Sequence, residues 1–235
     1  MPKHQKIIEH LNELSDSEIA EHSQRFFKTG KGEYGYGDIF LGIRVPVLRK
    51  AAKQFQYISL TEIQRLLKSK YHEVRLLSLI IMVGQYSKED NHKKEKIYGL
   101  YLKNTKYINN WDLVDSSAHY IIGPWLFDKD RSILYELASS KNLWERRISI
   151  MSTFHFIKNG EFTDTLQLSE ILIKDTEDLI HKAVGWMLRE VGNRNQEIEE
   201  KYLYKHYNKM PRTMLRYSIE KFTKARRQQY LKGEV

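Results

Sequence analysis

The chain has 235 residues, enough to bury a core as one large domain or as two small ones. Lys and Arg number 39 against 30 Asp and Glu, a formal net charge of +9 that suits a polyanionic partner, although a basic protein without such a partner has the same composition. The sequence contains no cysteine, which excludes disulfides, thiolate metal sites and a cysteine nucleophile.

Apolar residues recur every three or four positions with almost no strand-like alternation, and this pattern predicts an all-α fold. In chain order, helices are expected to begin near Gln5, Ser17, Val45, Thr61, Glu73, His92, Asn110, Arg131, Leu143, Thr165, Leu179, Gln196 and Pro211. The glycine-rich stretch 30–37 lacks the Gly-Lys-Ser/Thr ending of a phosphate-binding loop, so we interpret it as a mobile connection.

No long apolar segment stands out in the sequence. The first residues run directly into an amphipathic pattern, and the densest apolar run, 80–83, is far too short for a bilayer core of about 30 Å. We therefore expect a cytoplasmic protein that makes no membrane contact.

A helical repeat is the strongest organising signal. Residues at comparable positions near helix starts follow one another at intervals of 34 to 36: Arg75, Trp111, Arg147, Lys182 and Arg216. Helical hairpins with this period stack on one another, which predicts a single domain over residues 1–235 with a curved, concave inner surface. The basic members of the series would form a track for a phosphate backbone, or would simply extend to solvent at helix ends.

Two acidic residues lie close together in the segment that opens at Trp111. Trp111, Asp115, Ala118 and Ile122 fall along one row of the expected helix, so Asp115 interrupts an apolar stripe. Asp112 points about 60° further round the helix, where it caps the helix or meets solvent. Asp115 is therefore the better candidate for chemistry.

Arg147 and Trp186 are the other residues that break a pattern. Arg147 lies within the apolar face of its own helix and needs a partner; Asp115, one repeat earlier, is a reasonable one, although a purely structural salt bridge is the alternative. Trp186 lies off the core row of its helix and shares a face with Lys182, which indicates a ligand surface or an indole packed against a neighbouring hairpin.

Other catalytic designs find no support. The sequence contains no His-Glu-x-x-His, no Gly-x-Ser-x-Gly and no compact run of acidic residues for a two-metal site. We therefore expect a mechanism that uses neither a metal nor a cofactor.

The sequence resembles the AlkD-like family of DNA alkylation repair enzymes, which are DNA glycosylases with HEAT-like repeats. Four segments carry the resemblance, in this order and spacing: Phe40-Leu41-Gly42-Ile43-Arg44-Val45-Pro46, Trp111-Asp112-Leu113-Val114-Asp115-Ser116, Trp144-Glu145-Arg146-Arg147 and Lys182-Ala183-Val184-Gly185-Trp186-Met187-Leu188-Arg189-Glu190. A weaker fifth segment is Arg216-Tyr217-Ser218-Ile219, so the resemblance extends from about Phe40 to Phe222.

The resemblance implies an all-α solenoid of HEAT-like repeats with a concave basic groove. It also implies that Asp115 is catalytic, that Trp111 and Trp186 embrace the damaged nucleotide, and that Arg147 supports the site. Arg44, Arg75, Lys182, Arg189 and Arg216 are the expected DNA-binding residues.

Together with the residues described above, the resemblance implies a monofunctional, monomeric glycosylase that removes positively charged alkylpurines, such as 3-methyladenine and 7-methylguanine, from double-stranded DNA. Two alternatives stay open: a repeat protein that recognises bent or branched DNA without excision, and a protein-binding scaffold.

Overall fold

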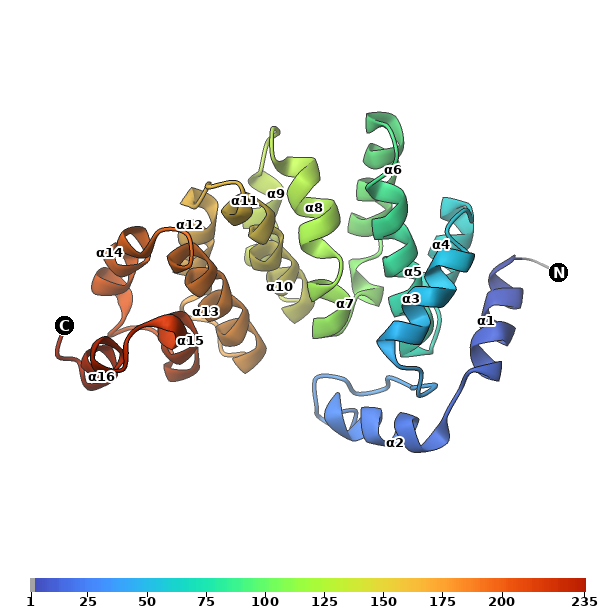
Figure 1. The fold of residues 1–235 in the computed structure, drawn as a ribbon, viewed down its shortest axis with the longest axis horizontal. Helices are drawn as coiled ribbons and strands as arrows, with labels where there is room; N and C mark the ends of the chain where they lie inside the picture. Colours follow the sequence, from blue (N-terminus) through green and yellow to red (C-terminus); the bar gives the residue numbers. More distant parts are fainter. Residues whose placement is uncertain (1–2) are drawn as a thin grey trace. The chain divides into compact units, whose positions relative to one another are not determined.

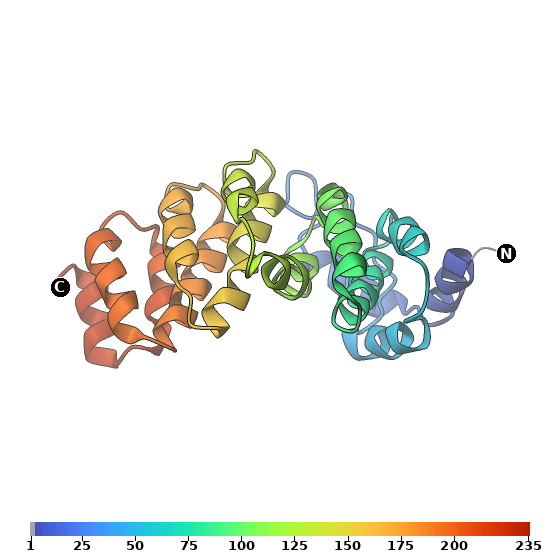
Figure 2. The ribbon, with the colours of Figure 1, turned by 90° about the horizontal axis from the view of Figure 1, so that it is seen from above.

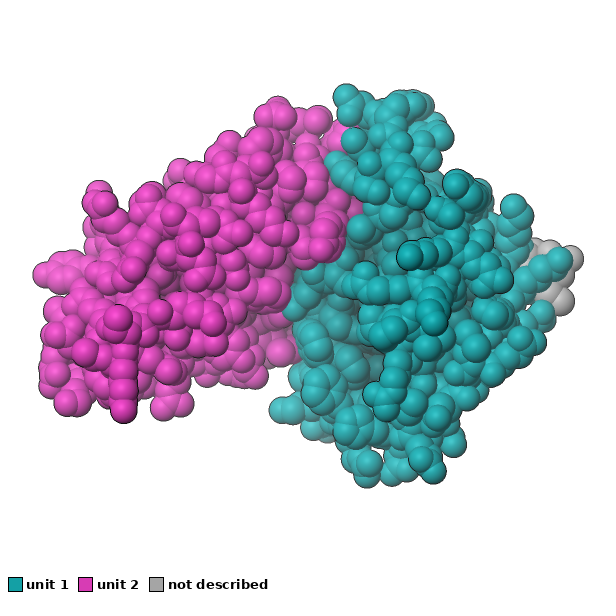
Figure 3. Space-filling view, in the orientation of Figure 1, with its two compact units in different colours: residues 1–117 teal, residues 118–235 magenta. Residues whose placement is uncertain are grey.

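The computed structural model describes residues 3–235, and these residues form helices joined by turns (Figure 1). Within this range, strand-like pairing is limited to an isolated bridge between Ile39 and Tyr71. The chain divides into two units, coloured separately in Figure 3; unit 1 ends at Ser117, and unit 2 begins at Ala118. Each unit has its own helical core.

Unit 1 is built around one long, deeply buried helix, α5. Its helices are α1 (Lys3–Glu13), α2 (Ser17–Phe26), α3 (Val45–Gln54), α4 (Leu60–Leu67), α5 (His72–Tyr86), α6 (Asn91–Leu102), the 3-10 helix η1 (Thr105–Tyr107) and α7 (Trp111–Asp115). Helices α3, α4, α6 and α7 all pack on α5. Because α5 is enclosed in this way, even charged side chains in its first turn are buried.

Unit 2 has α13 at its centre. Its helices are α8 (Ala118–Leu126), α9 (Ser132–Ala138), α10 (Leu143–Ser152), α11 (Phe154–Lys158), α12 (Thr163–Leu172), α13 (Asp178–Gly192), α14 (Gln196–His206), α15 (Arg212–Ser218), the 3-10 helix η2 (Ile219–Lys221) and α16 (Lys224–Lys232). Helix α13 packs between α10 and α15, and these three helices follow α12, α9 and α14 respectively in the chain (Figures 1 and 2).

Short polar side chains fix where many helices begin. Asp16, Ser59, Asp90 and Asn195 each accept a hydrogen bond from a backbone N–H in the first turn of the helix that follows. Such caps satisfy N–H groups that have no partner inside the helix. Helix α3 begins without a side-chain cap but carries Pro46 in its first turn, where the missing N–H costs nothing.

In the segment between α2 and α3, the backbone of Gly42 lies very close to the backbone at the start of α2. This residue has a φ of +79°, and a Cβ atom there would lie 1.9 Å from the carbonyl oxygen of Asp16. Only glycine satisfies both conditions. The segment that follows the glycine-rich stretch therefore lies firmly against the start of α2.

The all-α fold class predicted from the sequence is confirmed, and every predicted helix begins within two residues of an observed one. The row from Trp111 to Ile122 is wrong as a single helix, because the chain leaves helical geometry at Ser116–Ser117, between α7 and α8. Helices α11 and α16 were not predicted as separate elements. The single domain, the curved solenoid and the concave basic groove stay predictions.

Among the described helices, none combines the length and apolar character needed to cross a lipid bilayer.

Candidate functional site

Helix α7 in unit 1 carries two of the predicted site residues, Trp111 and Asp115. It is one turn long, and the Asn110 side chain caps it by accepting a hydrogen bond from the Trp111 N–H at 2.8 Å. Residues four apart lie on the same side of a helix, so the indole and the carboxylate are neighbours along α7. Both side chains are half-buried.

Asp115 lies close enough to the Tyr101 hydroxyl to affect its ionisation. Burial, reinforced by the Asp115 charge, raises the pKa of Tyr101, whose hydroxyl makes a 2.9 Å hydrogen bond with Ser117. Tyr101 therefore stays protonated and neutral at the end of α7. The negative charge at this point belongs to Asp115.

Aromatic rings from α2 and the segment after it hold Trp111. The Phe27 ring stacks on the indole with centroids 5.3 Å apart, and Phe26 meets the indole edge-on at 6.1 Å. Phe27 also stacks on Phe40, with ring centroids 5.0 Å apart, and its ring centroid lies 5.1 Å from that of His72. Phe26 is 58% exposed, so the cluster extends from the core of unit 1 to its surface.

A buried ionic network lies next to these rings. The two ring nitrogens of His72 face two carboxylates, with Nδ1 3.2 Å from Asp38 and Nε2 2.8 Å from Asp112. Arg75 donates to the other oxygen of Asp38 at 2.6 Å, and Asn110 also donates to Asp38. Asp112, predicted to cap the helix or meet solvent, accepts the Leu113 N–H in the first turn of α7 at 2.9 Å and also pairs with His72, while Asn110 is the N-cap.

The pKa values of the network follow from these contacts. Burial by itself lowers the pKa of His72, but the charge of Asp112 and the hydrogen bonds to both carboxylates outweigh burial and raise the pKa to about 9. Burial by itself raises the pKa of Asp38, yet hydrogen bonds from His72 and Asn110 and the charges of Arg75 and His72 hold it below its usual value. His72 is thus an imidazolium and Asp38 a carboxylate near neutral pH.

A pocket of about 650 Å³ opens beside this network in unit 1. Its walls come from α2, the start of α3, the start of α5 and α7, and include Phe27, Phe40, His72 and Asp112. The predicted DNA-binding residue Arg44 also lines this pocket and is exposed. Two rings of the aromatic cluster, the His72 imidazolium and the exposed Arg44 side chain therefore meet around one cavity.

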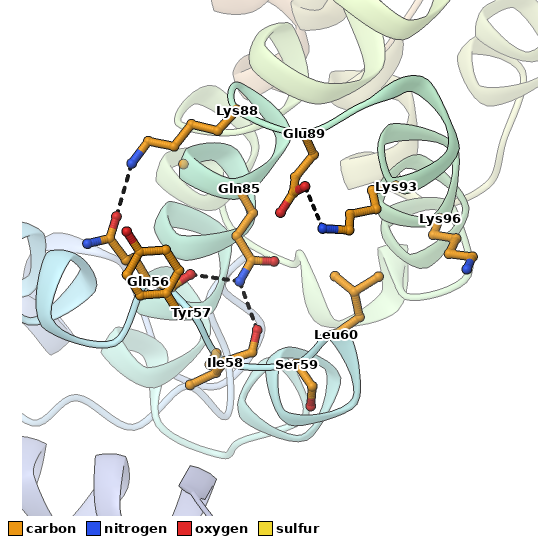
Figure 4. Close-up of a pocket in the computed structure, with 11 residues that line it drawn as sticks. Gln56, Tyr57, Ile58, Ser59, Leu60, Gln85, Lys88, Glu89, Lys93 and Lys96 are labelled. Carbon is orange, nitrogen blue, oxygen red and sulfur yellow. Dashed lines mark hydrogen bonds and ion pairs between the residues drawn. The ribbon is translucent and has the colours of Figure 1, made fainter.

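A second pocket of unit 1, about 510 Å³ in volume, lies at the other end of α5 (Figure 4). Its charged side chains are Lys88, Lys93, Lys96 and Glu89, and the Glu89 carboxylate is ion-paired with Lys93 at 2.7 Å. Lys88 donates to the side-chain oxygen of Gln56. A lysine-rich rim of this kind attracts polyanions weakly.

Unit 2 carries the other two predicted site residues. Arg147 on α10 is only 5% exposed and donates to the Leu179 carbonyl of α13, so the prediction that it lies within the apolar face of its helix is confirmed. Trp186 on α13 is half-buried; its Nε1 donates to Glu190 at 3.2 Å, and its ring lies 6.1 Å from that of Phe154. Its position off the buried core row of α13 is also confirmed.

Two cationic side chains lie near the ring of Phe154, the aromatic neighbour of Trp186. The Lys158 ammonium lies 4.1 Å from the centre of its ring, and the Arg194 guanidinium 5.8 Å. Burial and the charge of Arg194 lower the pKa of Lys158. The Trp186 side chain therefore lies beside a ring, Phe154, that itself contacts two cations, and the sequence pattern did not reveal this arrangement.

The predicted contact between Asp115 and Arg147 joins residues of different units, as does the predicted pair of walls formed by Trp111 and Trp186. Both stay predictions.

The predicted DNA-binding residues differ widely in how accessible they are. Arg216 is exposed; Lys182 is partly exposed and pairs with Asp178 at 2.7 Å, and Arg189 pairs with Glu220. Arg75 is 4% exposed, with its guanidinium bound to Asp38 and to backbone carbonyls of the segment before α5. A DNA phosphate could replace these buried partners only if it lost its own hydration, which costs a large free energy. Arg75 therefore does not fit the predicted phosphate track.

Sequence reasoning missed Asp38, Phe27 and His72 as parts of the site. His72 lies next to a predicted helix start, but its partners Asp38 and Asp112 lie 34 and 40 positions away. No local spacing rule connects residues so distant in the chain.

Within residues 3–235, no three His, Asp or Glu side chains are grouped as a metal site requires.

The sequence matches the model of the DNA alkylation repair enzyme family over residues 7–222, and the chain belongs to that family. This confirms the resemblance found in the sequence. None of the curated proteins matches the chain significantly.

Solved structures with the same fold include two of low sequence identity. One is a predicted DNA alkylation repair enzyme from Enterococcus faecalis, 17% identical, with a TM-score of 0.72 over 89% of this chain and 97% of that chain. The other is smu.31 from Streptococcus mutans UA159, 15% identical, with a TM-score of 0.50 over 92% of this chain and 95% of that chain. At these identities the likeness extends to the fold alone.

Proposed function

We propose that this DNA alkylation repair protein is a monofunctional DNA glycosylase that releases positively charged alkylpurines from double-stranded DNA. The observation that carries the proposal is that Asp115 and Trp111 lie on the same turn of α7, where the Phe27 ring stacks on the indole. Family membership supplies the repair context, and the formal charge of +9 suits a DNA partner.

The chemistry follows from the leaving group. An alkyl group on N3 or N7 of a purine gives the base a positive charge, so the base departs with the electrons of the glycosidic bond and needs no strong acid. The sugar becomes oxocarbenium-like, and water adds to its C1′ while its proton passes to the carboxylate or to solvent. Asp115 stabilises the cationic sugar and orients the water, an electrostatic effect worth about 10²–10³ in rate.

Trp111 selects for charge. A cation over an indole face gains about 0.5–2 kcal/mol, and this gain is lost when the base is neutral. In the proposal, Trp186 provides a second indole, and Arg147 orients the site or binds a phosphate. The exposed cations Arg44 and Arg216, with Lys182 and Arg189, are proposed to contact the DNA backbone.

The test is release of methylated purine from alkylated duplex DNA under single-turnover conditions. The wild type is expected to release 3-methyladenine and 7-methylguanine, and Asp115→Asn is expected to be slower by about 10²-fold or more. Asp128→Asn is the matched control, because Asp128 is exposed and lies outside α7. Equal rates for wild type and Asp115→Asn would remove Asp115 from the mechanism; tight DNA binding without release would instead identify a non-catalytic binder.

A further inference from the structure

Asp38 joins three segments of unit 1 at one buried point. Its carboxylate accepts hydrogen bonds from Arg75 at 2.6 Å and His72 at 3.2 Å, both on α5, and from the Asn110 amide at 3.2 Å. Asn110 is also the residue that caps α7. The segment before α3, the first turn of α5 and the start of α7 are thus tied to one another through Asp38.

The geometry around His72 determines its protonation state. The side chain is 2% exposed, and each ring nitrogen lies within hydrogen-bond distance of a carboxylate oxygen. A neutral imidazole has only one N–H, so the second contact would place two lone pairs against each other. Both contacts are favourable only when both nitrogens donate, which requires the imidazolium form.

The second carboxylate leads directly to the proposed active site. Asp112 is the second residue of α7 and accepts the His72 Nε2 hydrogen at 2.8 Å. Trp111 therefore stands between two residues, Asn110 and Asp112, that are both tied to the network on α5. A helix of five residues has few internal hydrogen bonds, so its orientation depends on contacts with its surroundings, namely these ties and the buried side chains Leu113 and Val114.

We propose that His72, as an imidazolium bridging Asp38 and Asp112, is a positioning residue that fixes α7 and thereby holds Trp111 and Asp115 in their working orientation. The proposal rests on the proposed function for its effect on activity. Its structural part, the coupling between the His72 charge and the orientation of α7, does not depend on that function.

The charge of His72 is subject to groups on every element packed around it. Asp38 from the segment before α3 and Asp112 from α7 stabilise the imidazolium, and Arg75 on α5 opposes it. Helix α2 adds Glu18 and His22 at the wall of the shared pocket. The pKa of about 9 leaves His72 charged at neutral pH, so the bridge is expected to fail only as the pH rises toward that value.

The experiment combines ¹⁵N NMR of labelled histidine and tryptophan with the excision assay across pH. At about pH 8, both His72 nitrogens are expected to show protonated shifts, whereas an ordinary histidine with a pKa near 6.5 is neutral. The Trp111 indole N–H resonance is expected to move together with the His72 titration. A neutral His72 at this pH, or an indole resonance unaffected by its titration, would overturn the proposal.

For activity, the wild-type single-turnover rate is expected to fall on the alkaline side with the same apparent pKa as His72. His72→Gln is expected to be about 10- to 100-fold slower with little change in DNA affinity, and to lack that alkaline fall. His10→Gln, on α1, is the control and is expected to keep the wild-type rate and profile. A folded His72→Gln variant with the wild-type rate and pH profile would refute the positioning role.

The two proposals fail in different ways. A wild type that releases no alkylpurine, but whose Trp111 resonance follows the His72 titration, would contradict the glycosylase function and support the coupling. A wild type that releases alkylpurines without any alkaline fall linked to His72 would support the function and refute the positioning role. The NMR titration uses the unmodified protein, so it decides the coupling even when His72→Gln does not fold.

Discussion

The Phe27 ring lies against the Trp111 indole with centroids 5.3 Å apart and planes 19° apart. Phe27 directly follows α2, whereas Trp111 begins α7, and the two residues are separated by most of unit 1 in the chain. One face of the indole is thus occupied by protein, and the rest of the half-buried ring borders the surface. A stacked support of this kind pre-orients an aromatic wall before any ligand arrives.

Replacing Phe27 by leucine is expected to weaken this support while keeping most of the apolar volume. Loss of the stacked pair is expected to lower the free energy of unfolding by about 0.5–1.5 kcal/mol and to slow excision. Urea denaturation followed by circular dichroism measures the first effect. Tyr204→Leu on α14 is the control, since Tyr204 is 67% exposed and its replacement should change stability by no more than about 0.5 kcal/mol. Equal losses in both variants would argue against a special role of the stack.

The helical fold was predictable because its cause is local. Apolar spacing at three and four residues, short polar caps and proline in first turns are all read within about ten residues of sequence. The breaks at Ser116–Ser117 and Thr153 were not predictable in this way, because apolar spacing continues across them. They arise from packing that no local pattern records.

The site was predictable only in part, for a related reason. Asp115, Arg147 and Trp186 stood out as exceptions to the pattern of their own helices, and the role of Trp111 was implied by the family resemblance. Asp38 did not, because nothing near it in the chain marks it as the partner of His72 and Arg75. Arg75 was misjudged for the same reason: a basic residue near a helix start resembles a phosphate ligand until its buried partner is known.

Salt dependence of DNA binding separates exposed from buried basic residues. Lys182→Gln and Arg216→Gln are each expected to reduce the slope of log K against log salt by about 0.9, the contribution of one phosphate contact. Arg75→Gln is expected to leave the slope unchanged but to destabilise unit 1 by about 1.5–3 kcal/mol, because it removes a charged hydrogen bond to the buried Asp38 carboxylate. Fluorescence anisotropy with a labelled duplex across a salt series measures the slopes. A slope reduced by Arg75→Gln alone would reverse this assignment.

Gly185, next to Trp186, allows α13 to approach α15 closely. A Cβ atom at this position would lie 2.5 Å from the Met214 carbonyl oxygen and 2.6 Å from the Tyr217 Cβ. Gly185→Ala is therefore expected to lower the free energy of unfolding by about 1–3 kcal/mol through overpacking. Gly84→Ala on α5 is the matched control: it meets no atom within 4 Å and should stabilise the protein by about 0.5–1 kcal/mol. Urea midpoints that shift in the same direction for both would contradict the steric argument.

Glu199 on α14 is a carboxyl group in an apolar setting, 1% exposed, and its Oε1 makes no hydrogen bond. Burial, reinforced by the charge of Glu200, raises its pKa to about 9 against the partial opposition of Arg189. The folded protein thus holds the protonated form, whereas the unfolded chain releases this proton near its ordinary pKa of 4.5. Glu199 therefore makes the fold less stable as the pH rises from 4.5 toward 9.

Glu199→Gln removes this proton linkage with almost no change in shape. The variant is expected to match the wild type at about pH 4.5 and to be more stable by an amount on the order of 1–3 kcal/mol at about pH 8, because glutamine has no proton to lose. Urea denaturation at several pH values measures the difference. Glu197→Gln, an exposed change in the first turn of the same helix, should show no such growth with pH. A constant difference between Glu199→Gln and wild type across this range would mean that Glu199 is ionised in the folded protein.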